Sequence, residues 1–90
     1  MHTIRDKTKL TNRVKRIQGQ LEGVTRQLLE EKEPDVILQS IASCRGAING
    51  LMLEVMKGHI ELHIMDATLP EVERAEGMRE LVAVLETYLK

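Results

Sequence analysis

The fold is decided by one long apolar stretch, residues 34–65, which reads PDVILQSIASCRGAINGLMLEVMKGHIELHIM. Its apolar residues recur at alternating gaps of four and three, the period of one helix face, with Gly58 at the one skipped position; they are Ile37, Ile41, Cys44, Ile48, Leu51, Val55 and Leu62. Such a helix spans on the order of 45 Å, more than a compact 90-residue monomer can bury. Apolar residues also flank this face, so more than one neighbour must cover the helix. The stretch predicts a helix that packs within an oligomer.

Two further helical segments flank this stretch. Residues 5–30 carry apolar residues at the same spacing, namely Leu10, Val14, Ile17, Leu21, Val24 and Leu28. Helices tolerate proline mainly in their first turn, so Pro34 and Pro70 mark the starts of the second and third helices. The chain has no Phe or Trp and a single Tyr, which disfavours a β-sandwich core. We expect an all-α fold in one domain, residues 1–90, with helices at about 5–30, 34–65 and 71–89.

The charges are unevenly distributed, although the net charge is only −1. Residues 1–30 hold seven Lys and Arg against three acidic residues, and the rest of the chain is acidic on balance. On one face of the first segment, Lys9, Arg13, Arg16 and Gln20 recur at helical spacing as a stripe that holds no apolar residue. This stripe is either a solvated face or a surface that contacts phosphates, for which the arginine fork is well suited. The pattern by itself leaves both interpretations open.

Three histidines are the candidates for metal binding. His59 and His63 stand four apart on one helix face, a spacing at which two imidazoles can bind one ion. The alternative is a pair of interfacial histidines making ordinary hydrogen bonds. His2 adds a third imidazole near the N-terminus. Cys44 lies on the apolar face of the long helix, where we expect a small buried side chain and not a reactive thiol.

Several function classes find no support in the sequence. It has no Gly-rich phosphate loop, no nucleophile motif with a base and no HExxH sequence, so we expect no enzyme. The scarcity of aromatic residues argues against single-stranded nucleic acid as the ligand. No membrane span or signal peptide is expected, and a lone cysteine fits the cytoplasm. The pairs Gly19/Gly23 and Gly46/Gly50 are interpreted as points of close backbone approach between helices, with a local kink as the alternative.

Three segments together resemble the CsoR/RcnR/FrmR family of metal- or formaldehyde-responsive transcriptional repressors. They are HTIRDKTKL at residues 2–10, RVKRIQGQLEGV at 13–24, and LQSIASCRGAINGLMLEVMKGHIELHI at 38–64. The likeness covers essentially the whole chain and is nearest to the nickel/cobalt-responsive RcnR branch, with the formaldehyde-responsive FrmR branch second. It implies a three-helix protomer, an antiparallel four-helix-bundle dimer, and a dimer of dimers.

The resemblance also implies roles for individual residues. The family's DNA-contacting positions correspond to Lys9, Arg13, Lys15, Arg16 and Arg45. Its metal-binding histidines correspond to His2, His59 and His63, at a site between protomers. The family's cysteine ligand is absent, because Pro34 stands in its place. Possible additional ligands are the amine of Met1 and the carboxylates of Glu33 and Asp35.

The expected function is that of a cytoplasmic, homo-oligomeric repressor that binds double-stranded operator DNA. It would release the DNA on binding a divalent transition metal, with nickel, cobalt and zinc suited to imidazole ligands. Two alternatives stay open. One is a formaldehyde-responsive repressor of the same family, and the other is a helical interaction scaffold that does not bind DNA.

Overall fold

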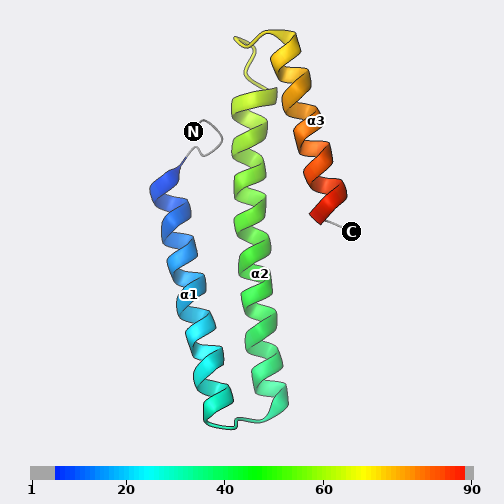
Figure 1. Ribbon diagram of the computed structural model, residues 1–90. Helices are drawn as coiled ribbons and strands as arrows, with labels where there is room; N and C mark the ends of the chain where they lie inside the picture. The colour runs from blue at the N-terminus through cyan, green and yellow to red at the C-terminus, as the bar shows by residue number, and fades with distance from the viewer. Residues whose placement is uncertain (1–5, 89–90) are drawn as a thin grey trace. The chain divides into compact units, whose positions relative to one another are not determined.

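The computed structural model describes residues 6–88, which form three α-helices and a short π-helical turn (Figure 1). Helix α1 spans Lys7–Leu29, α2 spans Pro34–His59, and α3 spans Glu71–Tyr88. The π-helical turn η1, Ile60–Ile64, continues α2 directly. No strand occurs among residues 6–88, so the predicted all-α class and its three helices are confirmed.

The helix ends follow the local chemistry. Pro34 is the first residue of α2, and α3 begins directly after Pro70, as the two prolines predict. Helix α1 ends in a Schellman motif, in which Glu31 adopts the left-handed conformation with φ 54°. The Lys32 amide donates to the Gln27 carbonyl at 3.0 Å, and the Glu31 amide donates to the Leu28 carbonyl at 3.1 Å. These bonds satisfy carbonyls that the helix end would otherwise leave unpaired.

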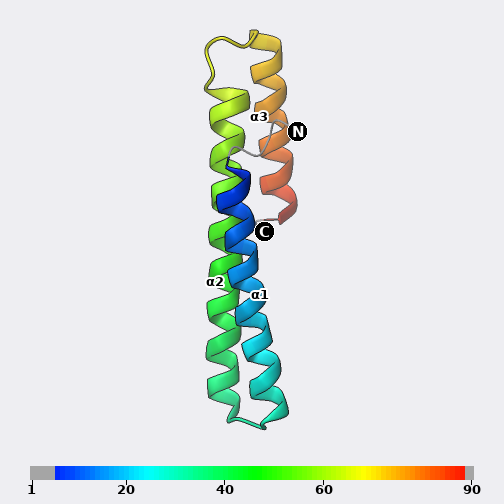
Figure 2. The same cartoon turned by 90° about the vertical axis from the view of Figure 1, so that its left-hand side faces the viewer.

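The described chain divides into two compact units, residues 6–52 and residues 53–88. In the first unit, α1 and the first part of α2 run side by side as a helical hairpin (Figures 1 and 2). Ile17, Val24 and Cys44 form its buried core. Cys44 is a free cysteine and is 3% exposed, which confirms the prediction that its side chain is buried. That the whole chain folds as one domain stays a prediction.

The hairpin buries only one edge of the apolar face of each helix. Residues that alternate with the core positions stay exposed, from 39% for Val14 to 57% for Leu28. On each helix they recur every seven residues; together they are called the apolar seam, which consists of Val14, Leu21 and Leu28 of α1 and Ile41 and Ile48 of α2. A strip with this heptad spacing is typical of a helix surface that another helix covers.

The continuous helical stretch Pro34–Ile64 bears on the expectation that the chain has no membrane span. This helix is long enough and apolar enough to cross a membrane, and its most apolar 18-residue segment has a mean hydropathy of 1.3. Only 6% of that segment is buried within the protein. Length and composition are weak evidence, since the core helix of a soluble protein passes the same test. An apolar helix left this exposed needs a covering surface, which a second protein copy supplies as well as lipid does.

In the second unit, α3 packs against η1 after a short turn. The turn is held at Asp66, whose Oδ1 accepts hydrogen bonds from the Thr68 amide at 2.9 Å and the Thr68 hydroxyl at 2.6 Å. These bonds, with the charge of Arg74, hold the pKa of the Asp66 carboxyl below its ordinary value of 3.8. Arg74 Nε in turn donates to the Ile64 carbonyl at 2.8 Å, which caps the end of η1.

The predicted α-helical geometry is wrong for the last turn before residue 65. Residues 60–64 form a π-helix, closed by a 2.8 Å hydrogen bond from the Met65 amide to the Ile60 carbonyl five residues earlier. The hydrophobic period gives no signal for this change, because one wide turn leaves the surrounding pattern intact. Single π-helical turns occur often at functional sites, and this one carries His63.

Candidate DNA-binding and effector sites

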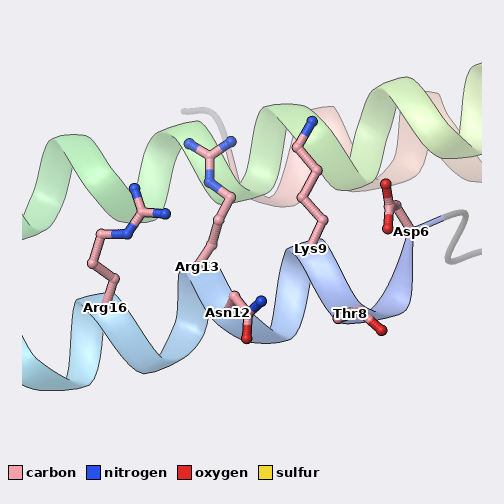
Figure 3. A pocket seen from close by; sticks show the side chains of 6 residues that line it. All are labelled: Asp6, Thr8, Lys9, Asn12, Arg13 and Arg16. Atoms are coloured by element: carbon pink, nitrogen blue, oxygen red, sulfur yellow. The ribbon is translucent and has the colours of Figure 1, made fainter.

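A basic groove lies along the first three turns of α1. It is a surface hollow of about 590 Å³ lined by Asp6, Thr8, Lys9, Asn12, Arg13 and Arg16. Figure 3 shows the side chains of Lys9, Arg13 and Arg16 pointing to the same side of the helix. Lys9 and Arg16 are separated by seven residues, or about 10 Å of helix. The structure therefore brings together three of the five predicted DNA-binding residues.

The other two predicted residues lie away from this groove. Lys15 is exposed on α1, but it is two residues from Arg13 and so lies on a different face. Arg45 is exposed on α2, next to the buried Cys44, and does not line the groove. Their roles in DNA binding stay predictions. The neutral groove residues Thr8 and Asn12 were not predicted from the sequence. Their spacing could have indicated them, because Thr8, Asn12 and Arg16 follow one another at intervals of four, which places side chains on one helix face.

The basic groove continues into a polar seam between α1 and α2. A hollow of about 120 Å³ is lined by Arg13, Arg16, Ile17, Gln20 and Ala47. The next, of about 250 Å³, is lined by Gln20, Gly23, Gln27, Ser40 and Ser43. Long polar side chains of α1 thus lie opposite small side chains of α2. Arg13 belongs to both the groove and the first of these hollows, and it is half-buried where Lys9 and Arg16 are exposed.

The glycine pairs do not mark a close approach of helix backbones within the hairpin, so that interpretation is wrong for the protomer. A Cβ atom added at Gly19 or Gly46 would meet nothing within 4 Å. At Gly23 it would meet only the Arg26 guanidinium, at 3.7 Å. At Gly50 it would lie 2.8 Å from Arg13 Nη2, which is a side-chain contact. The close backbone approach occurs instead at Gly77 of α3, where an added Cβ would lie 2.8 Å from the His63 carbonyl oxygen.

His59 and His63 form a stacked pair at the junction of α2 and η1. Their ring centroids are 5.0 Å apart and the ring planes differ by 26°. The Nε2 of His59 lies 2.8 Å from the Gly77 carbonyl oxygen, so this nitrogen carries the proton and donates it. The carboxylate of Glu80 lies 3.9 Å from the same nitrogen. The other nitrogen of His59, Nδ1, is therefore the one with a lone pair available to a ligand.

The histidine pair suits a metal ion. Metal-binding histidines commonly donate their second ring N–H to a carbonyl or carboxylate, as His59 does to Gly77. The Nε2 of His63 is buried with no hydrogen-bond partner among the described residues, which leaves it available as a ligand. A metal held by His59 and His63 would supply a positive charge and a crosslink between these side chains.

No complete metal site forms within residues 6–88 of one protomer, where no three His, Cys, Asp or Glu side chains are arranged to bind an ion. His2 and Met1, predicted as further ligands, lie outside the described residues. Glu33 and Asp35 flank the first residue of α2, whereas His59 is its last, about seven helical turns further along. The two histidines would therefore supply only part of a coordination shell.

A small apolar cavity of about 210 Å³ borders this pair. It is lined by Val55, Met56, His59, Glu80, Leu81 and Val84, from the end of α2 and from α3. Leu81 is buried, and its side chain together with the buried Gly77 holds this face of α3 against the histidines. No sequence pattern marked Gly77, which stands alone in a polar segment.

Known proteins share both the sequence and the fold. Residues 6–87 match the family described as metal-sensitive transcriptional repressor. The transcriptional repressor RcnR of Citrobacter koseri is 46% identical over 89 residues, covering 99% of this chain and 98% of that protein. RcnR of Salmonella typhimurium matches with the same identity and coverage.

A solved structure agrees with this relationship. It is a Glu-to-His variant of the formaldehyde-responsive regulator FrmR from Salmonella enterica serovar Typhimurium, with a TM-score of 0.82 and 38% identity. The match covers 92% of this chain and 93% of that one. Family members are transcriptional repressors and not enzymes, so both the family resemblance and the expected absence of enzymatic activity are confirmed. This chain belongs to the metal-sensitive transcriptional repressor family.

Proposed function

We propose that the protein binds double-stranded operator DNA through its basic groove and releases it when a divalent transition metal binds the histidine pair. The observation that carries the DNA-binding part is the grouping of Lys9, Arg13 and Arg16 along one side of the groove. Their span of about 10 Å corresponds to about three base-pair steps along the axis of a duplex, at roughly 3.4 Å per step. Lys15 and Arg45 would add contacts from neighbouring faces.

The proposed effector is nickel, cobalt or zinc. Imidazoles suit these borderline ions, and Pro34 removes the thiolate that a copper(I) sensor would favour. His59 and His63 would provide two ligands and His2 a third. The Met1 amine, or a carboxylate from Glu33 or Asp35, would complete the shell.

The proposed metal site lies between two copies of the chain. Glu33 and Asp35 flank the start of α2 and the histidines lie at its end, so two copies paired antiparallel bring the opposite ends of α2 together. The apolar seam supplies the surface for this pairing, because its exposed heptad residues would complete a four-helix bundle. Two such dimers would form the tetramer. Metal binding then weakens DNA binding only if the released state holds the metal more tightly than the DNA-bound state.

Fluorescence anisotropy on a labelled duplex tests the proposal. The duplex is one that the wild-type protein selects from a random-sequence pool, and the complex is titrated separately with Ni(II), Co(II), Zn(II) and Cu(I). Release by one or more of the divalent ions, but not by Cu(I), is expected. Failure to bind any duplex at low salt would contradict the DNA-binding role and favour the scaffold alternative. Tight binding that no metal relieves would contradict the effector assignment alone.

A double variant tests the histidine pair. His59→Ala with His63→Ala should abolish both the Co(II) absorption spectrum and metal-dependent release, while DNA binding without metal is retained. Glu61→Ala is the matched control, because Glu61 lies between the two histidines in the same turn and is exposed. An unchanged Co(II) spectrum in the double variant would exclude the pair as ligands.

Formaldehyde is the second candidate effector. It is favoured by the likeness in fold to a variant of a formaldehyde-responsive regulator. Without the family's cysteine, the group available to react would be the amine of Met1. Operator release by formaldehyde in the presence of a metal chelator, lost when this amine is acetylated, would support this alternative over metal.

A further inference from the structure

Gly50 of α2 lies directly beneath the guanidinium of Arg13. A Cβ at this position would lie 2.8 Å from Arg13 Nη2, which is closer than non-bonded atoms approach, and 3.9 Å from Cζ, which is an ordinary contact. Arg13 therefore occupies the space that a side chain at residue 50 would fill. The arginine is half-buried there, whereas Lys9 and Arg16 on either side of it are exposed.

Gly46 lies on the same helix one turn earlier and makes no such contact. A Cβ added at Gly46 would meet nothing within 4 Å, so an alanine would fit there without displacing any neighbour. Glycine inside a helix is less favourable than alanine because it loses more backbone freedom on folding. Both residues carry this cost, but only at Gly50 does the missing side chain make room for a cation of the basic groove.

We propose that Gly50 is a positioning residue for DNA binding, which lets α2 hold the Arg13 guanidinium in place at the edge of the basic groove. This inference rests on the proposed role of Arg13 in binding operator DNA. A guanidinium held against a helix loses less conformational freedom when it grips a phosphate than one on a free side chain. Helix α2 would thereby contribute to DNA binding without touching the DNA.

The inference predicts opposite effects on stability and on DNA binding. In Gly50→Ala the added methyl meets the far end of a flexible side chain, so Arg13 can swing away and the fold is retained. The helix itself gains from alanine, and the thermal midpoint should rise by a few degrees. The displaced guanidinium should weaken DNA binding about tenfold, the scale of one charge-assisted hydrogen bond. If Gly50 had only a structural role, the substitution would not raise the thermal midpoint while lowering the affinity for DNA.

The experiment compares Gly50→Ala with Gly46→Ala in the full chain. Thermal unfolding is followed by circular dichroism, and affinity for the selected duplex by anisotropy at several salt concentrations. Both variants should be at least as stable as the wild type, but only Gly50→Ala should lose affinity. Equal affinity of the two variants would overturn the proposal. If Gly50→Ala instead unfolds at a lower temperature than the wild type, the expectation that Arg13 yields to the methyl group is wrong.

A double-mutant cycle distinguishes this inference from the proposed function. In an Arg13→Ala background, Gly50→Ala should cause no further loss of affinity, because the group that it displaces is already absent. An additional, independent loss would overturn the positioning role. If Arg13→Ala itself leaves affinity and its salt dependence unchanged, the proposed DNA-binding role of Arg13 fails. If Arg13→Ala weakens binding and Gly50→Ala does not, only the role of Gly50 fails.

Discussion

The hairpin unit and the C-terminal unit hold their functional side chains in contrasting ways. In residues 6–52 the basic groove is open, and Lys9 and Arg16 are exposed to solvent. In residues 53–88 the His59 ring is hydrogen-bonded to the Gly77 carbonyl of α3, and the Nε2 of His63 is buried. A surface of exposed cations attracts any polyanion over distances of about 10 Å. An enclosed imidazole pair instead selects its ligand by distance and direction. The two units are thus suited to a long-range electrostatic contact and to a short-range coordination contact, respectively.

The apolar seam gives the largest expected effect, because the proposed dimer forms through it. Ile48→Glu would bury a charge in the proposed dimer interface, at a cost of several kcal/mol. Self-association should weaken by at least about a hundredfold, as measured by analytical ultracentrifugation. Gln39→Glu is the control, since Gln39 is an exposed polar residue of α2 outside the seam. Equal self-association of the two variants would show that the seam is not the interface.

The basic groove gives the next largest effect. Arg13→Ala should weaken binding to the selected duplex by about ten- to a hundredfold and reduce the slope of log K against log salt by about 0.9. Lys15→Ala, on another face of α1, should cost less. Anisotropy titrations from low to moderate salt measure both quantities. A larger loss with Lys15→Ala would move the DNA-binding face away from the groove.

The C-terminal unit should respond most strongly at Gly77. In Gly77→Ala the Cβ would press on the His63 backbone, which cannot move aside as a long side chain can. We expect a destabilisation of about 1–3 kcal/mol, in urea unfolding of the full chain. Gly46→Ala, which meets no neighbour, should be neutral or stabilising. Similar effects of the two substitutions would mean that α3 is not packed closely on η1.

The turn at Asp66 gives the smallest effect, which depends on pH. The pKa of this carboxyl is lower in the folded chain than its ordinary value of 3.8, so the ionised form stabilises the fold. This contribution is present above the ordinary pKa and is lost as pH falls through the lowered value. Thermal midpoints of wild type and Asp66→Ala should therefore differ slightly at neutral pH and converge in acid. A difference that grows in acid would contradict this assignment.

Sequence patterns predicted the parts of the fold that depend on period and on proline. The alternating spacing in α1 and α2 indicated the helix faces, and Pro34 and Pro70 located two helix starts. The pattern could not tell which residues of a face the hairpin covers. Ile17 is buried and Val14 is exposed, although both belong to the same apolar series. That distinction depends on how the two helices are rotated against each other, which no single-helix pattern contains.

The candidate sites were predicted in part. The stripe of Lys9, Arg13 and Arg16 followed from helical spacing, and the His59/His63 pair from the same rule. Three features were invisible to spacing because they involve residues distant in the sequence. They are the hydrogen bond from His59 to the Gly77 carbonyl, the position of the Arg13 guanidinium against Gly50, and the capping of η1 by Arg74. The π-helical turn was missed because it changes the backbone without changing the pattern.

The exposed face of the long helix has a consequence for the amount of repressor in the cell. A newly made single chain buries only 6% of its most apolar stretch, so under the proposed pairing its survival depends on meeting other copies. Folded repressor should therefore accumulate more steeply than in proportion to synthesis, since dilute chains are lost to degradation before they pair. A gene with such a product has a built-in threshold, below which low expression yields almost no working repressor.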